Sequence, residues 1–255
     1  MRRARFPVAA LILLLLPSAG TAHAQSHESP ARAVSALHRE FAKKSGVVFS
    51  RRTVEWDVAM TVAHGRHRFA PRVGVYASDV KETYSTGGEP TRFRMINIGR
   101  DSYVQDERTD LPKGKKWRHW RNAEGFLWSR DLVDALNPEF LRLISPGAKR
   151  VSTGDRYDGV RTTRFDGSVK VALLGTRKAG IFYGPKKATY AGGRIEWKLW
   201  LGPDDLPRRF QARILFGPIG PDREMRITRM NVLYKRWGSP VRITAPPRRM
   251  VAKAP

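Results

Sequence analysis

The clearest pattern in the chain is an alternation of apolar and polar residues in its last third. Ile195, Trp197, Leu199 and Leu201 occupy every second position of one segment. The alternation resumes at residues 208–216, after a Gly-Pro-Asp-Asp run that is typical of a turn. A period of two places one apolar face and one mixed face on an extended strand. Residues 195–201 and 208–216 are therefore predicted to form an antiparallel hairpin with one dry face and one basic face.

Similar alternation predicts further strands along most of the chain. They are expected at residues 53–63, 73–84, 91–99, 102–106, 116–120, 160–165, 168–173 and 225–234. The last strand shifts its alternation near Thr228, which favours a β-bulge, and Asp166-Gly167 is expected to be a turn. Hairpins joined in this way predict a curved antiparallel sheet with a hollow face.

Few segments have a helical pattern. Residues 30–44 form an amphipathic helix by their spacing, and residues 131–136 are a candidate helical turn. In residues 137–144, Asn137 is placed to cap a helix, Pro138 stands at its first position, and a Ser-Pro-Gly run ends it. Residues 175–193 fit either a surface loop or a flap with an apolar tip, and the tail from Pro246 is expected to be loose.

The first 24 residues have the pattern of a secretory signal peptide. Three arginines precede the apolar run 8–16, and small residues lead to an Ala-x-Ala site ending at Ala24. General secretion is favoured over twin-arginine export, because Arg2-Arg3 lacks the rest of that motif. No cysteine follows the apolar run, so we expect a protein secreted or associated with the cell envelope, outside the cytoplasmic membrane and without a lipid anchor. The expected organisation is a signal peptide (1–24), one domain (25–247) and a basic tail (248–255).

Composition narrows the picture further. The chain has no cysteine, which excludes a disulfide scaffold. Three of its 48 basic residues and none of its 23 acidic residues fall in the signal peptide, so the mature chain carries 45 − 23 = +22. The basic residues are spread along the sequence. Three interpretations stay open: a solvated face, nonspecific attraction to an anionic membrane or cell-wall polymer, or nucleic acid.

Catalytic chemistry has little support in the sequence. The sequence contains no H-E-x-x-H motif of metalloproteases, no G-x-S-x-G motif of serine hydrolases and no glycine-rich phosphate-binding loop. His64 and His67 are three positions apart on a predicted strand, where their side chains would point apart instead of sharing a metal. Ser78 and Lys81 match the S-x-x-K spacing of acylating enzymes, but on a strand rather than a helix start. We therefore expect no enzyme, no cofactor and no metal.

The candidate binding residues are the apolar members of the alternating segments. They are expected to share one side of the sheet, with Glu55, Asp57, Lys198 and Arg213 on the other. The predicted ligand-binding set is Trp56, Val58, Met60, Phe93, Met95, Trp197, Leu199, Phe210 and Ile214.

Several phrases of the sequence, taken in order, resemble one group of proteins. They are residues 96–104 with 111–117, 136–138 with Leu141, 158–165, 200–202 with 206–210, and 237–241. This order is similar to the LolA-like fold, in particular to actinobacterial LppX/LprAFG-type exported proteins. The resemblance implies a strongly curved antiparallel half-barrel of the α+β class with a few helices on its concave face, where some members carry acyl chains. The chain departs from the lipoprotein members by lacking their cysteine.

Three functions stay open at this point. The first is a non-enzymatic extracytoplasmic carrier or sensor of lipid or acyl-bearing molecules in an apolar concave cavity. The second is an envelope-associated interaction or regulatory module of the same fold without lipid cargo. The third is an enzyme or nucleic-acid binder. We expect a monomer without a specific nucleic-acid partner.

Overall fold

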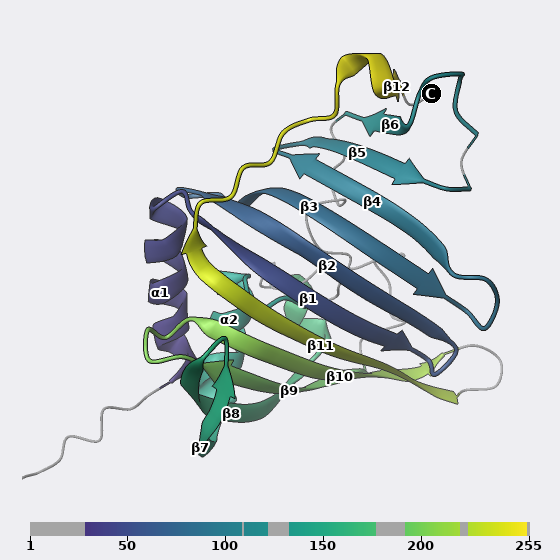
Figure 1. The fold of residues 1–255 in the computed structure, drawn as a ribbon. Helices are drawn as coiled ribbons and strands as arrows, with labels where there is room; N and C mark the ends of the chain where they lie inside the picture. Colours follow the sequence, from purple (N-terminus) through teal and green to yellow (C-terminus); the bar gives the residue numbers. More distant parts are fainter. Residues whose placement is uncertain (1–28, 109, 122–132, 177–191, 220–223, 254–255) are drawn as a thin grey trace, which may run out of the picture.

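The computed structural model describes residues 29–108, 110–121, 133–176, 192–219 and 224–253, and it is dominated by one curved sheet (Figure 1). The strands are β1 (Gly46–Glu55), β2 (Ala59–Ala70), β3 (Gly74–Ser85), β4 (Thr91–Ile98), β5 (Asp101–Asp106), β6 (Trp117–Trp120), β7 (Lys149–Tyr157), β8 (Val160–Lys170), β9 (Arg194–Leu201), β10 (Pro207–Ile219), β11 (Glu224–Ser239) and β12 (Val251–Lys253). Their order is β12-β6-β5-β4-β3-β2-β1-β11-β10-β9-β8-β7. Every pairing is antiparallel except that between β12 and β6. The open, curved sheet with few helices confirms the predicted α+β half-barrel class.

The helices pack on one side of the sheet, which we call the inner face; the other side is the outer face. They are α1 (Pro30–Ala42), α2 (Pro138–Ile144) and α3 (Ala172–Thr176), with 3-10 turns at Ser145–Gly147 and Arg248–Met250. The ring of Phe140 in α2 meets Phe210 of β10 edge-on at 5.6 Å, and Phe41 of α1 lies 5.0 Å from Phe69 of β2. No helix among the described residues is long and apolar enough to cross a membrane.

Local capping explains why the helices begin where they do. The Asn137 side chain accepts hydrogen bonds from the backbone amides of Glu139 and Phe140, as predicted for an N-cap. Ser29 caps α1 in the same way, and Pro30 occupies its first turn. Both helices predicted from spacing are therefore confirmed. The described part of residues 131–136 contains a turn, closed by the hydrogen bond from the Asn137 amide to the Asp134 carbonyl at 3.1 Å.

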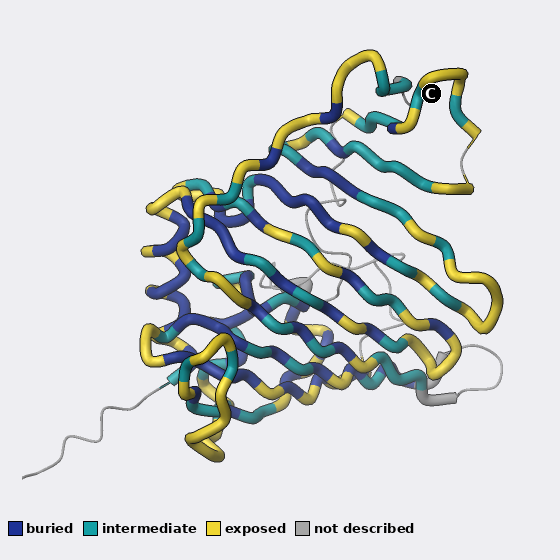
Figure 2. The backbone as a smooth tube through the Cα atoms, in the orientation of Figure 1, coloured by how far each residue is buried: buried dark blue, intermediate teal, exposed yellow. Residues whose placement is uncertain are grey.

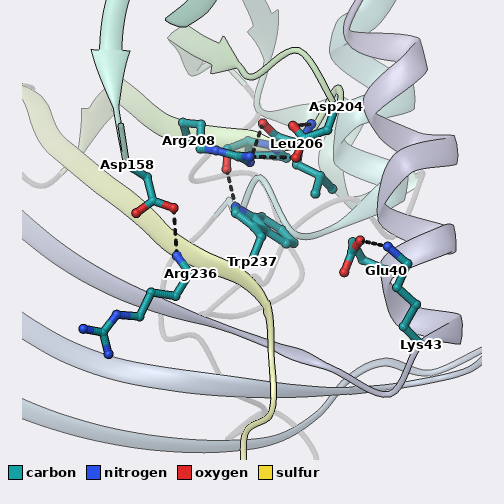
Figure 3. Close-up of polar contacts among 9 residues, drawn as sticks. Glu40, Lys43, Asp158, Asp204, Leu206, Arg208, Arg236 and Trp237 are labelled. Atoms are coloured by element: carbon teal, nitrogen blue, oxygen red, sulfur yellow. Dashed lines mark hydrogen bonds and ion pairs between the residues drawn. The ribbon is translucent and has the colours of Figure 1, made fainter. Parts of the chain in front are cut away.

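Polar contacts fix the region where α1, β10 and β11 meet (Figure 3). The indole of Trp237 donates a 2.8 Å hydrogen bond to the carbonyl of Pro207. The backbone amide of Arg236 donates to the Asp158 carboxylate at 2.9 Å. In the predicted Gly-Pro-Asp-Asp turn, Asp204 accepts from Arg208 at 2.7 Å. The first two contacts hold the end of β11 against β10 and the β7–β8 turn.

Two features predicted inside the sheet, a turn and a β-bulge, are wrong. Residues 160–165 and 168–173 were expected as two strands, yet β8 runs unbroken through Asp166-Gly167. The indole of Trp197 packs on Gly167, where an added Cβ would come within 2.4 Å of it. Gly167 therefore does not form a turn; its lack of a side chain allows the Trp197 ring to approach the backbone of β8. The bulge expected near Thr228 is also absent, because the register of β11 with β1 and β10 is continuous there.

The C-terminal segment is not a loose tail. Residues 248–250 form a 3-10 turn, and β12 pairs in parallel with β6, so that Val251 lies opposite Trp117. The segment leading to it contributes Ile243 to a small apolar cluster with Ala77 and Ile96. Backbone pairing and apolar burial together explain its order, and Figure 1 shows the segment in yellow crossing toward β6.

Candidate ligand-binding face

Six of the nine predicted binding residues lie on the inner face. The strand registers connect them in rows, since residues paired across neighbouring strands project from the same side of a sheet. One such row runs Phe93, Glu82, Ala63, Arg51, Val232, Phe210 and Leu199. Met95, Trp197 and Ile214 belong to parallel rows of the same face. Lys198 and Arg213 lie on the outer face, as expected. Glu55, expected there too, pairs through Thr228 with Ile214 and so belongs to the inner side, and Asp57 lies in a turn.

The other three residues correct the prediction. Residues 53–63 are not one strand, because Trp56 and Asp57 adopt positive φ angles of 54° and 57° and turn the chain back on itself. Trp56 and Val58 therefore lie in an exposed loop, and Met60 pairs with Val54 on the outer face. The turn contains no glycine or asparagine, so the apolar alternation appeared to continue through it.

The inner face of β8–β11 is a packed core. Phe210 and Leu199 are fully buried, and Trp197 and Ile214 are each 2% exposed. All four belong to one cluster with residues of α1 and α2. These side chains pack against the helices, so this part of the inner face forms core and not the wall of an open cavity.

The inner face of β1–β5 has a different character. Buried polar side chains occupy positions that the alternation alone would assign to apolar residues. We call this set the polar strip; it consists of Arg51, His67, Ser78, Glu82, Asn97 and Ser102. Apolar rows separate its members, as where Val80 pairs with Met95 and Met95 with Val104.

One end of the polar strip holds a buried ion pair. An Nη atom of Arg51 lies 2.5 Å from a carboxylate oxygen of Glu82. Nearby, the His67 ring stacks on Phe49 with ring centres 4.4 Å apart. Burial lowers the pKa of His67 to about 3, assisted by the charge of Arg51. His67 is therefore neutral at physiological pH. His64 lies on the outer face, so the two histidines point apart, as predicted.

The other end of the strip contains hydrogen-bonding atoms with spare capacity. The Asn97 amide donates to the Ser78 hydroxyl at 3.0 Å, and Asn97 pairs across the sheet with Ser102. Within the described part of the chain, Asn97 Oδ1 and Ser102 Oγ are buried without a hydrogen-bond partner. Buried polar atoms are nearly always satisfied, so these two call for water or a ligand. Asn97 continues the period of Phe93 and Met95, a signal that would have placed it on this face from sequence.

The outer face carries a separate groove of about 660 Å³. It runs over β1 and β8–β11, and its charged and amide side chains project away from the helices. Charged and amide groups line it, among them Arg52, Asp166, Glu196, Lys198, Gln211, Arg213, Arg229 and Asn231. Four of these are cations and two are anions, so the groove is net basic.

No known family model matches this chain, and no curated protein matches its sequence. Among solved structures, the chain is similar to a DUF1329 family protein from Desulfovibrio piger. The two are 12% identical, the match covers 80% of this chain and 89% of that chain, and the TM-score is 0.28. A likeness of this size carries no argument about function.

Proposed function

We propose that the protein is a non-enzymatic carrier or sensor of acyl-bearing molecules that acts outside the cytoplasmic membrane, as the resemblance to LppX/LprAFG-type proteins implies. The observation that carries the proposal is the inner face of β1–β5, where a buried polar strip alternates with apolar rows. Such a surface suits an amphiphile, because a polar head needs hydrogen-bond partners and an acyl chain needs a dry wall.

The two ends of the polar strip would serve different purposes. The Arg51–Glu82 pair satisfies its own charges, so it contributes polarity without demanding a charged ligand. Asn97 Oδ1 can accept one hydrogen bond, and the Ser102 hydroxyl can donate or accept one. We expect a hydroxyl or amide of the ligand head at Asn97 and Ser102, with its chain along Val80 and Met95.

Native mass spectrometry and solvent extraction of the purified mature protein test this proposal. We expect an acyl-bearing compound to copurify, and delipidated protein to bind a long-chain lysophospholipid. Ser102→Ala and Asn97→Leu should reduce the bound fraction. Ser50→Ala is the control, because Ser50 lies on the outer face of β1. A delipidated protein that binds no lysophospholipid, with nothing extracted beforehand, would refute a carrier role.

A second function is an interaction module of the cell envelope without cargo. The packed inner face of β8–β11 and the basic outer groove favour it. In that case an anionic cell-wall polymer would bind the outer groove. Arg52→Ser and Lys198→Ser together should weaken retention on such a polymer, while lysophospholipid binding stays unchanged.

A further inference from the structure

Exposed apolar side chains gather at one end of the sheet. Trp56, Val58 and Met60 are 44%, 66% and 36% exposed at the β1–β2 turn. Tyr84 of β3 is 37% exposed beside them, because Met60 pairs with Ser85, the residue that follows it. We call these four residues the exposed tip. Figure 2 shows the exposed turn that joins β1 and β2 at the end of the sheet away from α1.

The turn keeps these residues at a conformational cost. Trp56 and Asp57 both lie in the left-handed region, which suits glycine and asparagine but is an outlier for a bulky side chain. An Asn-Gly pair would form this turn with less strain. Trp56 in addition exposes a large ring to water. Strain and exposure at the same residue indicate selection for what the tip contacts.

The charges around the tip favour an anionic surface. The Arg226 guanidinium lies over the Trp56 ring, 4.7 Å from its centre. Arg229 forms an ion pair with Asp57, so that carboxylate is compensated. Among the described residues of the turn, Glu55 is the one other exposed carboxylate. Tryptophan and arginine are both suited to the headgroup region of a bilayer, where an apolar body and a polar end are needed together.

We propose that the exposed tip inserts into the headgroup region of an anionic lipid bilayer. The positive charge of the chain brings the protein to the surface, and Trp56 and Val58 supply the apolar contact. The geometry also deepens the carrier function proposed above. Tyr84 and Glu82 lie two residues apart on the same side of β3, so the polar strip begins next to the exposed tip. An amphiphile leaving a bilayer at the tip would therefore enter along the inner face.

The chain offers a matched control for this proposal. Val73 is 65% exposed, as Val58 is 66%, but it lies in the β2–β3 turn at the opposite end of β2. Val58→Ser and Val73→Ser remove the same apolar area and leave the charge unchanged. Both residues are exposed, so both variants should fold with unchanged thermal melting.

Flotation with phosphatidylglycerol/phosphatidylcholine vesicles in dilute buffer distinguishes the two ends. Val58→Ser should lower the vesicle partition coefficient about tenfold, which is roughly the effect of burying one valine side chain. Val73→Ser should bind as the natural protein does, and retention on DNA should be the same for all three. Equal binding of the two variants would overturn the proposal and leave charge alone as the cause.

Cargo is measured separately, so the two proposals can fail independently. Val58→Ser should still bind a lysophospholipid in detergent-free solution, because the polar strip is untouched. Ser102→Ala should still float with vesicles. A protein that floats normally with vesicles but binds no lysophospholipid would support membrane insertion of the exposed tip and refute the carrier function.

Discussion

The Arg51 guanidinium and the Glu82 carboxylate meet 2.5 Å apart on the inner face, and both side chains are almost entirely buried. Removing one member takes this partner away from a charge that stays buried. We expect Arg51→Met to lower the free energy of unfolding by about 3–5 kcal/mol, and Arg51→Met with Glu82→Leu to recover much of it. Urea denaturation measures both.

The control for this pair is another ion pair on the surface. Arg213 and Glu196 lie 3.1 Å apart with both side chains exposed. Arg213→Met should change stability by less than about 1 kcal/mol, because solvent screens an exposed pair. A loss as large as that of Arg51→Met would contradict the importance given to burial.

His67 should make the protein sensitive to acid. Its pKa is lowered from 6.5 to about 3 in the folded state, so the unfolded chain binds a proton that the folded chain excludes. The stabilising contribution is complete above pH 6.5 and is lost as the pH falls toward 3, by up to about 1.4 kcal/mol per pH unit. Urea denaturation between pH 7 and 4 should show a shallower decline for His67→Gln. An NMR titration of His67 near pH 6.5 would disprove this origin.

Two tryptophans that the sequence assigned to one face should respond differently to alanine. Trp197 is 2% exposed and packs on Gly167, so Trp197→Ala should cost about 3–5 kcal/mol of stability. Trp56 lies in the exposed turn, and Trp56→Ala should change stability by no more than about 0.5 kcal/mol. Comparable losses of stability for the two variants in urea denaturation would indicate that Trp56 is buried in the core.

Export is predicted to remove the first 24 residues. The charged start, the short apolar run and the Ala-x-Ala site direct cleavage after Ala24. N-terminal sequencing of protein from the culture medium or cell envelope should begin at Gln25, and the intact mass should show no lipid. A mature protein that starts at Met1 would contradict the predicted export and cleavage.

Charge alone should produce long-range, unselective binding. With +22 on the mature chain, we expect retention on DNA and on an anionic cell-wall polymer in dilute buffer. Moderate salt should release both, because the Debye length is only about 8 Å at physiological ionic strength. Salt titrations should show steep slopes and no DNA sequence preference. Salt-resistant binding to one nucleic-acid sequence would argue against an envelope role.

Features determined by neighbouring residues could be predicted from the sequence. The cap at Asn137 and the hairpin of β9 and β10 depend on residues within one turn or one loop, and both are confirmed. Trp56-Asp57 is equally local but lacks turn chemistry, so its positive φ angles gave no signal. Strand β7 is exposed along most of its length and shows no apolar alternation.

The rest depended on contacts between distant segments. Arg51 and Glu82 are on separate strands, and an arginine at an alternating position looks like a solvated residue until its partner is known. The parallel pairing of β12 with β6 likewise joins segments far apart in the chain. The polar strip was therefore beyond a reading based on local periodicity, except at Asn97.

The pairing of β1 with β11 has a consequence for how the protein is made. Thr53 of β1 lies opposite Met230 of β11, so the seam between the two halves of the sheet joins an early strand to a late one. Such pairing has a high contact order and forms slowly. While the ribosome is still adding residues 224–239, β1 lacks one of its two neighbouring strands and the two halves of the sheet cannot join. The complete sheet therefore cannot form until synthesis is almost finished.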